Sequence, residues 1–329
     1  MSKIVIDVNP EFCYELVCSI PYAYHLHKNN QLEKVITCKG MKPFYYFCDN
    51  VEERYNERNI DNFSNGVQNL PNSWLHHNAM AVYGKDYKEL TEDQRNKVQG
   101  VLDYSEWDVP DYLNHFKNDR FKFDKPMIVI ANQYNFESNW VSMSKSWNPH
   151  RYFDIKCLYE MFEYLTNKGY SVLYKRPKNT EFAVDENEKR TLTLHPQNNI
   201  KLEANVEGVG VINDYELTKH YDDVYLIDDI VEQNPNYTYN EIQLMLFANS
   251  KGFVSVSGGS GILTGYFKKP NILYCTIGRE KSPHYWSKDS YYHKISDNQA
   301  IPVIDDCEEI YKRGRQDYTE LLQKIKETF

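Results

Sequence analysis

The feature that most constrains the fold is the alternation of strand-like and helix-like segments along the whole chain. Short runs rich in β-branched and aromatic residues, typical of buried strands, are separated by longer segments with apolar residues at helical spacing. Such runs predict strands at 3–8, 34–38, 44–48, 126–131, 170–174, 223–227, 252–257 and 271–276. Consecutive parallel strands need a crossover connection, so this alternation predicts α/β units built on parallel sheets.

The helices expected between these strands differ in how clearly the sequence marks them. Apolar spacing predicts a helix over 152–168, closed by Gly169, and another over 239–249. A first helix over 12–30 contains Pro21, which is expected to kink it or split it in two. Further helical segments are expected at 86–105, where Thr91 opens a start signal, at 262–267 and at 306–328.

The length of the chain predicts two structural units. At 329 residues it is too long for one typical domain and comfortable for two. The sequence divides best into a Rossmann-like unit at 1–122, a second at 123–305 and a final helix at 306–329 that packs back, with a polar loop region at 52–80. Ligands of such sheets bind beyond the carboxyl ends of the strands, so functional residues are expected there.

Composition narrows the class of partner and the cellular compartment. The net charge of −9 argues against nucleic acid as the main partner, because the phosphate backbone selects basic surfaces. No run of apolar residues has the length of a signal-peptide core or a membrane span. The seven cysteines include no C-x-x-C pair, which is typical of reduced thiols. A cytoplasmic protein is therefore expected.

A glycine-rich turn follows the strand expected at 252–257. The chain has 14 glycines, and four of them fall within the eight positions 258–265. The segment Ser257-Gly258-Gly259-Ser260-Gly261 either makes a tight turn needed for folding or holds a phosphate with backbone N–H groups at a helix start. Because Ile262 stands where a dinucleotide fingerprint has glycine, and no G-K-[ST] follows, the two commonest phosphate loops are excluded.

Cations and carboxylates occupy other predicted loop positions. Lys175 and Arg176 end the 170–174 strand and Arg279 follows the 271–276 strand, so they form either a diphosphate clamp or a solvated basic loop. Glu11 and Glu15 follow the first strand, where each is a candidate general base, although Glu15 also suits a helix N-terminus. No metal site is expected, since Asp228-Asp229 is an adjacent pair and no D-x-D occurs.

From about 126 to 277 the chain resembles the GT-B glycosyltransferases of the heptosyltransferase-like and fucosyltransferase-like kind. The pieces that carry the resemblance are KPMIVIA, HRYFDIKCLYEMFEYLTNKG, YSVLY, DVYLID, YNEIQLMLFANSKG, FVSVSGGSG and KKPNILYC, with Lys269-Pro270 matching the family's usual Lys-Pro. Glu15 stands six residues before Pro21, so the resemblance places it at the family's proposed catalytic carboxylate. Two positions depart from the family pattern: Tyr14 replaces a glycine, and Ile262 replaces a histidine.

The resemblance implies an inverting, metal-independent transfer of a hexose or pentose from UDP or GDP to a glycan hydroxyl, without a bound cofactor. Glu15 or Glu11 is then the base. The expected donor-binding residues are Asn132 and Asp228 near the nucleobase, and Lys175, Arg176, Ser257, Gly258, Gly259, Ser260, Gly261 and Arg279 around the diphosphate.

Two further functions fit the same fold. One is a sugar-nucleotide epimerase, and the other is a glycan-binding protein without activity that uses the 28 tyrosines and five tryptophans. An NAD(P) oxidoreductase is disfavoured, because the first predicted strand–helix turn contains no glycine.

Overall fold

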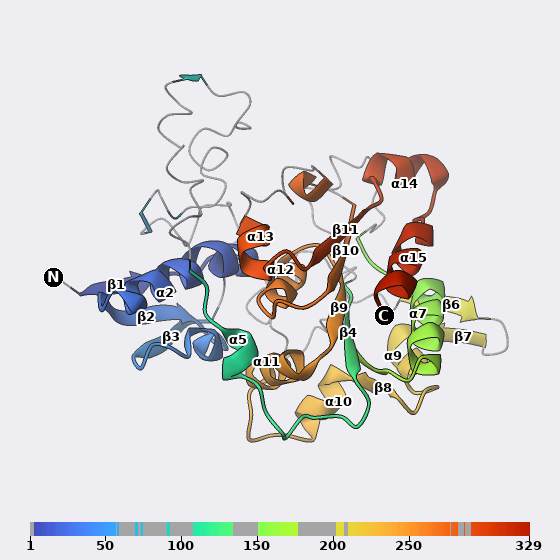
Figure 1. The fold of residues 1–329 in the computed structure, drawn as a ribbon, viewed down its shortest axis with the longest axis horizontal. Helices are drawn as coiled ribbons and strands as arrows, with labels where there is room; N and C mark the ends of the chain where they lie inside the picture. The colour runs from blue at the N-terminus through green and yellow to red at the C-terminus, as the bar shows by residue number, and fades with distance from the viewer. Residues whose placement is uncertain are drawn as a thin grey trace.

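The computed structural model describes residues 3–56, 58, 70–71, 74, 91–92, 108–133, 151–176, 202–206, 210–276, 278–281, 286 and 291–329. Within them the chain forms a three-stranded sheet, a six-stranded sheet and a two-stranded hairpin, with helices around both larger sheets (Figure 1). All neighbouring strands of the two larger sheets are parallel. The predicted α/β class with two Rossmann-like units is therefore confirmed. The expected helix at 86–105 lies outside the described residues, apart from 91–92.

The first unit contains strands β1 (Ile4–Asp7), β2 (Leu32–Cys38) and β3 (Val51–Tyr55) in that spatial order. The strands expected at 3–8 and 34–38 are confirmed. The strand expected at 44–48 is wrong, because this segment begins with a 3-10 helix, η2 (Lys42–Tyr45), which Pro43 starts and which buries Phe44 and Tyr45. The third strand is instead the polar segment β3, which lies at the edge of the sheet with its side chains partly or fully exposed.

The crossover from β1 to β2 changes its helical form before Pro21. It runs through α1 (Phe12–Tyr14), a π-helix η1 (Glu15–Ser19) and α2 (Ile20–Lys28). Pro21 has no N–H to donate to the preceding turn, so a carbonyl of that turn needs another donor. The Tyr266 hydroxyl of the second unit donates to the carbonyl of Leu16 in η1. The predicted division at Pro21 is present as this change of helix type.

The second unit has the strand order of a Rossmann sheet. Its strands are β4 (Met127–Ala131), β5 (Ser171–Lys175), β8 (Val224–Leu226), β9 (Gly252–Val256), β10 (Asn271–Cys275) and β11 (Ala300–Ile304). They lie in the order β11-β10-β9-β4-β5-β8, which makes β4 and β9 the neighbours where the chain reverses its direction of winding. Sequence reasoning missed β11, an edge strand that tolerates Pro302 because its missing N–H lies at the sheet margin.

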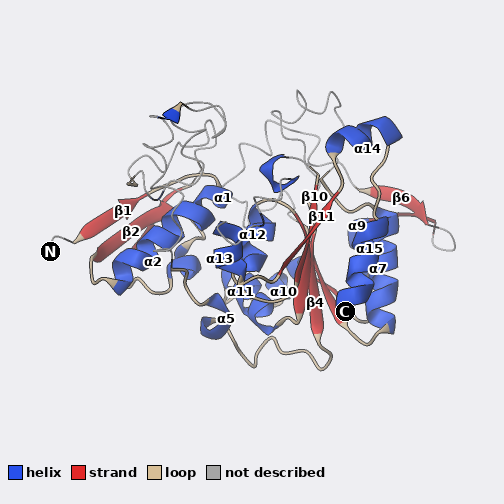
Figure 2. Ribbon diagram, turned by 45° about the horizontal axis from the view of Figure 1, so that its top comes forward, coloured by secondary structure: helices blue, strands red, loops and turns tan. Residues whose placement is uncertain are grey.

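Helices cover both faces of the six-stranded sheet (Figure 2). The face toward the first unit carries α10 (Ile227–Glu232), α11 (Tyr239–Asn249), α12 (Gly259–Gly265) and α13 (Tyr291–Ser296). The opposite face carries α7 (Ile155–Asn167), α9 (Asp214–Thr218) and α15 (Thr319–Thr328). The helices expected at 152–168 and 239–249 are confirmed, and the one expected at 262–267 begins three residues earlier, at Gly259.

The remaining described elements lie around these layers. They are α5 (Tyr112–His115), the hairpin strands β6 (Glu203–Val206) and β7 (Gly210–Asn213), the 3-10 helix η8 (Gly278–Lys281) and α14 (Cys307–Arg313). The helical segment expected at 306–328 is α14 followed by α15, and α15 packs back against α7 and β10 of the second unit. Among the described residues, every helix is too short or too polar to cross a bilayer.

The pleat of the six-stranded sheet divides its side chains between two cores. Met127, Val129 and Leu173 face α10–α13 and belong to one core, whereas Ile128 and Val172 face α7, α9 and α15 and belong to the other. The first core continues into the first unit, where it includes residues of β1, η1 and η2. The two units therefore share one apolar core along the face on which they meet.

Candidate functional site

The reversal point of the six-stranded sheet places two strand ends side by side. β4 ends at Ala131 and is followed by Asn132 and Gln133, and its neighbour β9 ends at Val256 and is followed by the glycine-rich turn. Open α/β sheets bind ligands at this edge and at this reversal point. The position of the turn therefore agrees with the position expected of a ligand site in this sheet.

Backbone geometry accounts for three of the glycines in the turn. Gly258 has φ +125°, which strongly favours glycine. A Cβ on Gly259 would lie 2.9 Å from Cδ1 of Phe12, and a Cβ on Gly261 would lie 2.9 Å from the carbonyl oxygen of Val256. Tight turning and close packing are thus sufficient reasons for these glycines. An anion site at this turn therefore requires cationic or hydrogen-bond-donating side chains around it.

Lys175 is the first of these side chains. It ends β5, is almost completely buried, and its Nζ donates to Oγ of Ser260 in the first turn of α12 at 3.0 Å. Lys175 shares the face of β5 with Leu173, which packs toward the same helix layer as α12. The structure therefore brings the expected lysine and the expected turn together.

Arg151 is a second cation beside the turn, and sequence reasoning missed it. A Cβ built on Gly258 would lie 3.7 Å from both Cζ and Nη1 of Arg151. With the Gln133 amide turned so that its oxygen faces the guanidinium, that oxygen accepts from Arg151 Nε at 2.5 Å and Nη2 at 3.1 Å. A signal was present in the sequence: Arg151 lies shortly before α7, and the helix after a parallel strand starts at the edge where the strands end.

Two carboxylates contributed by different units act on the thiol of Cys13. Burial raises the pKa of Cys13, and the charges of Glu11 and Glu280 raise it further, while Arg151 opposes them. Glu11 precedes α1 in the first unit, and Glu280 lies in η8, just after β10. Because charge–charge interactions weaken with distance, their common effect on Cys13 places Glu11, Glu280 and Arg151 in one neighbourhood. Glu11 and Glu280 are both partly exposed.

The thiol of Cys275, at the end of β10 in the second unit, is affected by two of the same charged groups. Burial raises the pKa of its thiol, the charge of Glu280 adds to this, and Arg151 opposes it. The backbone N of Cys13 would also lie 3.7 Å from a Cβ on Gly259. The glycine-rich turn, Arg151 and the acidic pair thus form one cluster, which we call the turn cluster: Glu11, Gln133, Arg151, Lys175, Ser257–Gly261 and Glu280.

Glu15, the other expected base, is not a member of the turn cluster and is not accessible to solvent. Its side chain and that of Arg58 are both fully buried, and Arg58 Nη1 donates to Glu15 Oε2 at 2.5 Å. The other carboxylate oxygen accepts from Thr37 Oγ1 and, at 3.0 Å, from the Tyr45 hydroxyl. Protein donors therefore occupy both oxygens, and an acceptor hydroxyl cannot reach the carboxylate in this conformation.

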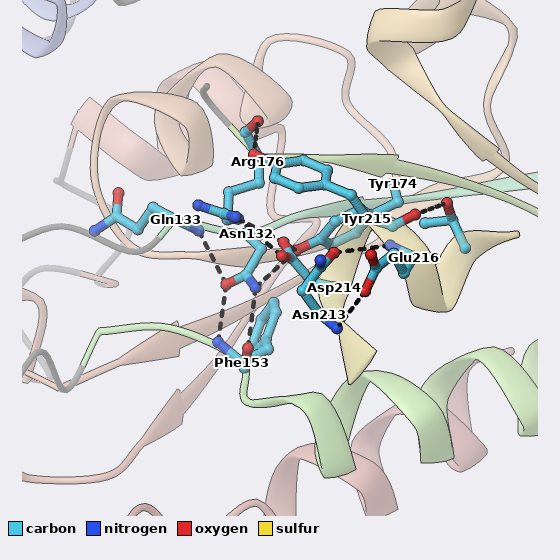
Figure 3. A network of polar contacts seen from close by, with 10 residues as sticks. Asn132, Gln133, Phe153, Tyr174, Arg176, Asn213, Asp214, Tyr215 and Glu216 are labelled. Atoms are coloured by element: carbon cyan, nitrogen blue, oxygen red, sulfur yellow. Dashed lines mark hydrogen bonds and ion pairs between the residues drawn. The ribbon is translucent and has the colours of Figure 1, made fainter. Parts of the chain in front are cut away.

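Arg176 faces away from the glycine-rich turn. Its Nε and Nη2 donate to the two carboxylate oxygens of Asp214 at 2.5 and 2.9 Å, and its guanidinium lies over the Tyr215 ring at 4.4 Å from the centroid (Figure 3). Tyr174 also donates to Asp214, at 2.7 Å. Arg176 shares the face of Tyr174, opposite to that of Lys175. The structure thus separates the two cations that the sequence places together.

Asn132 and Asp228 are connected with this same buried network. The amide of Asn132 donates to the carbonyl of Phe153 and to the Tyr174 hydroxyl, and its oxygen accepts from the N–H groups of Gln133 and Phe153 (Figure 3). Asn132 therefore joins the end of β4 to the segment before α7. Asp228 lies in the first turn of α10, and its charge contributes to the raised pKa of Tyr215, which burial dominates.

The remaining expected site features are described in part. The backbone of Arg279 lies in η8, and its side chain is outside the described part of the structure. Within the described ranges, no group of three or more His, Cys, Asp or Glu side chains is arranged to hold a metal ion. All seven cysteines are thiols, and five of them are buried.

The protein therefore has two α/β units, and the glycine-rich turn at the end of β9 lies near two cations, Lys175 and Arg151. Carboxylates of both units, Glu11 and Glu280, belong to the same cluster.

Among solved structures, the chain is similar to E. coli ADP-heptose LPS heptosyltransferase II, with 11% identity, coverage of 99% of this chain and 100% of that one, and a TM-score of 0.46. It is also similar to the dodecameric iron-containing heptosyltransferase TibC, with 11% identity, 88% and 61% coverage, and a TM-score of 0.39.

A third similar structure is the wall teichoic acid polymerase TagF, with 12% identity, coverage of 99% of this chain and 60% of that one, and a TM-score of 0.26. No family model and no curated protein matches the sequence. At these TM-scores the likeness does not assign the chain to a family.

Proposed function

We propose that the protein is a glycosyltransferase that moves a sugar from a nucleotide-diphosphate donor to a hydroxyl group of a glycan acceptor. The observation that carries this proposal is the turn cluster itself. Lys175 and Arg151 arrive from different segments at the strand end where an α/β sheet binds ligands. Glu11 reaches the same neighbourhood from the other unit. This arrangement suits a diphosphate on one side and a hydroxyl group that must lose a proton on the other.

In the proposed reaction, Glu11 takes the proton from the acceptor hydroxyl as its oxygen attacks the anomeric carbon. The bond between that carbon and the diphosphate oxygen breaks, and the leaving diphosphate gains negative charge. Lys175, Arg151 and the N–H groups of the glycine-rich turn stabilise this charge. The proposed reaction is a single displacement without a metal ion, with a UDP- or GDP-linked hexose or pentose as donor.

Glu11 is preferred to Glu15 as the base for a geometric reason. A general base must come within hydrogen-bond reach of the proton it removes. Glu11 is partly exposed and lies in the turn cluster, whereas Glu15 is fully buried, with both oxygens occupied by Arg58, Thr37 and Tyr45. This assignment moves the catalytic role from the position implied by the family resemblance to a carboxylate four residues earlier.

The direct test is thermal unfolding with UDP, GDP and ADP at millimolar concentration in the presence of EDTA, followed by a transfer assay with the best donor. A ligand at 100 times its dissociation constant stabilises the folded state by about 2.7 kcal/mol, so the Tm should rise by several degrees. Arg151→Gln should remove most of this rise, whereas Lys219→Met, an exposed lysine outside the turn cluster, should leave it unchanged. If none of the three nucleotides raises the Tm, the proposal fails.

One observation favours a second candidate, a sugar-nucleotide epimerase. The turn cluster contains a second carboxylate, Glu280, and removal and return of a proton on opposite faces of a sugar needs two such groups. An epimerase converts the donor without any acceptor. Proton NMR of the nucleotide sugar with the protein alone distinguishes the two, because a glycosyltransferase leaves the donor's sugar configuration unchanged under these conditions.

A further inference from the structure

We propose that Glu15 and Arg58 are a buried positioning pair that holds residues 10–13 against the glycine-rich turn. The inference rests on the proposed function only for the catalytic consequence, namely the placement of Glu11. Its structural part concerns the order of one loop and is testable without any substrate. It gives Glu15 a role different from that of a base.

The first support for this inference is that Arg58 contacts the loop at two residues, Pro10 and Phe12. The same Nη1 atom that donates to Glu15 Oε2 also donates to the carbonyl oxygen of Pro10 at 2.7 Å. The guanidinium carbon lies 5.3 Å from the centroid of the Phe12 ring. Arg58 therefore contacts the residues on both sides of Glu11, one through the backbone and the other through the ring.

The second support is the surface against which the loop is held. Phe12 is buried and packs so closely on Gly259 that no Cβ fits between them. The loop thus lies between the guanidinium of Arg58 and the backbone of the glycine-rich turn. With Pro10 and Phe12 both fixed, the backbone of Glu11 has little freedom to change direction.

The third support is the way Glu15 fixes Arg58. Thr37 from β2 and Tyr45 from η2 both donate to the carboxylate, which leaves it directed at Arg58. Burial raises the pKa of Tyr45 well above its usual value, and Glu15 adds to this effect, so the phenol keeps its proton to donate. A pair built only for stability would not need to contact the loop that carries Glu11.

The test combines hydrogen–deuterium exchange with steady-state kinetics on three variants of the full chain. In Arg58→Met the amides of residues 11–14 should exchange at least tenfold faster than in the wild type, and Glu15→Gln should show a smaller increase. Arg58→Lys keeps the charge and should partly restore protection. Arg176→Met, which breaks the buried pair with Asp214, is the matched control and should leave the exchange of residues 11–14 unchanged.

In the transfer assay, Glu15→Gln should lower kcat at least tenfold with an unchanged dissociation constant for the donor and an unchanged pH profile of kcat. If Arg58→Met does not fold, Glu15→Gln alone decides the matter through the same two measurements. Unchanged exchange of residues 11–14 in the folded variants overturns the inference. It is also overturned if Glu15→Gln abolishes the acidic limb of the pH profile of kcat, since Glu15 would then be the base.

The failure of this inference differs from the failure of the proposed function. A wild-type protein without nucleotide binding or transfer removes the proposed function, and the exchange measurement still reports whether the pair orders the loop. If the wild type transfers sugar and the variants match it in exchange and in kcat, the positioning role of Glu15 and Arg58 is overturned and the proposed function stands.

Discussion

The hydroxyl of Tyr266, directly after α12, donates a hydrogen bond to the carbonyl of Leu16 in the π-helix of the first unit. The two residues are 250 positions apart, and both are buried. This bond satisfies a backbone carbonyl in the turn that precedes Pro21, and it joins the helix after the glycine-rich turn to the segment that begins with Glu15.

Tyr266→Phe tests the value of this bond. The substitution leaves a buried carbonyl without its donor, so the free energy of unfolding should fall by about 1–3 kcal/mol. Urea denaturation measures the loss. Tyr311→Phe is the control, because Tyr311 is 56% exposed and its hydroxyl can be hydrated. Equal stability of Tyr266→Phe and wild type would mean that the bond contributes nothing.

Gly258→Ala tests the special backbone of the glycine-rich turn. At φ +125° an alanine is strained, at a cost of about 1–3 kcal/mol, and its Cβ would contact Arg151. The variant should therefore lose stability and also nucleotide-dependent stabilisation. Gly314→Ala is the matched control, because Gly314 also has a positive φ, at +71°, in the turn that ends α14. Gly314→Ala should lose stability but keep nucleotide binding. If both variants lose nucleotide binding, the effect of Gly258→Ala is not local to the glycine-rich turn.

Glu11→Gln tests the assignment of the base. Removal of a positioned general base lowers kcat by about 10²–10⁴, and the neutral amide should leave donor binding intact. Single-turnover kinetics and calorimetric titration of the donor measure the two quantities. Asp7→Asn is the control, since Asp7 pairs with Arg54 and Tyr55 and lies outside the turn cluster. A kcat within twofold of the wild type would exclude Glu11.

Arg176→Met tests the separation of Arg176 from Lys175. Breaking a buried ion pair costs about 3–5 kcal/mol because it leaves Asp214 without its charge partner. Stability should fall by this amount in urea denaturation, whereas the nucleotide-induced rise in Tm should persist at temperatures where the variant is folded. A variant with normal stability and no nucleotide effect would return Arg176 to the donor site.

Lys269 predicts a pH dependence of stability. Its ammonium group donates to the carbonyls of Phe247, Ala248 and Ser250 at the end of α11, while burial first, and then the charges of Lys117 and Lys251, lower its pKa from 10.5 to about 7. Between pH 7 and 10.5 the unfolded chain therefore binds more protons at this position than the folded chain. Stability from this group should rise with pH across that window.

The measurement compares wild type with Lys269→Met in urea at pH 7 and pH 9. The difference in free energy of unfolding between the two proteins should move in favour of the wild type by about 1.4 kcal/mol for each pH unit within the window. A shift in the opposite direction would show that the three carbonyls keep the ammonium form dominant in the folded protein.

Much of the second unit was predictable because its strands are buried on both faces. Runs such as 126–131 and 271–276 are almost wholly apolar, and no other short element combines that composition with flanking helices. The strands that escaped prediction are at sheet edges. β3 is polar because solvent reaches it, and β11 contains a proline that an interior strand would not accept.

The location of the candidate site was predictable from the sequence, but several of the side chains that form it were not. The glycine-rich turn after β9 and the lysine after the 170–174 run were both found from the sequence, and the structure joins them. The choice between Lys175 and Arg176 depends on which face of β5 carries α12, and the sequence alone does not reveal this. Glu15 could not be separated from Glu11, because its partner Arg58 lies 43 residues away in a stretch expected to be loop.

The apolar core shared by the two units has a consequence for synthesis on the ribosome. The strands of the first unit are complete by Tyr55, but α12 (Gly259–Gly265), which packs on α1 and η1 of that unit, is synthesised much later. At about 5–20 residues per second, roughly 10–40 s separate the two events. During this interval the nascent chain exposes the apolar surfaces of α1 and η1 that α12 covers in the folded protein, and exposed apolar surface of this kind favours aggregation.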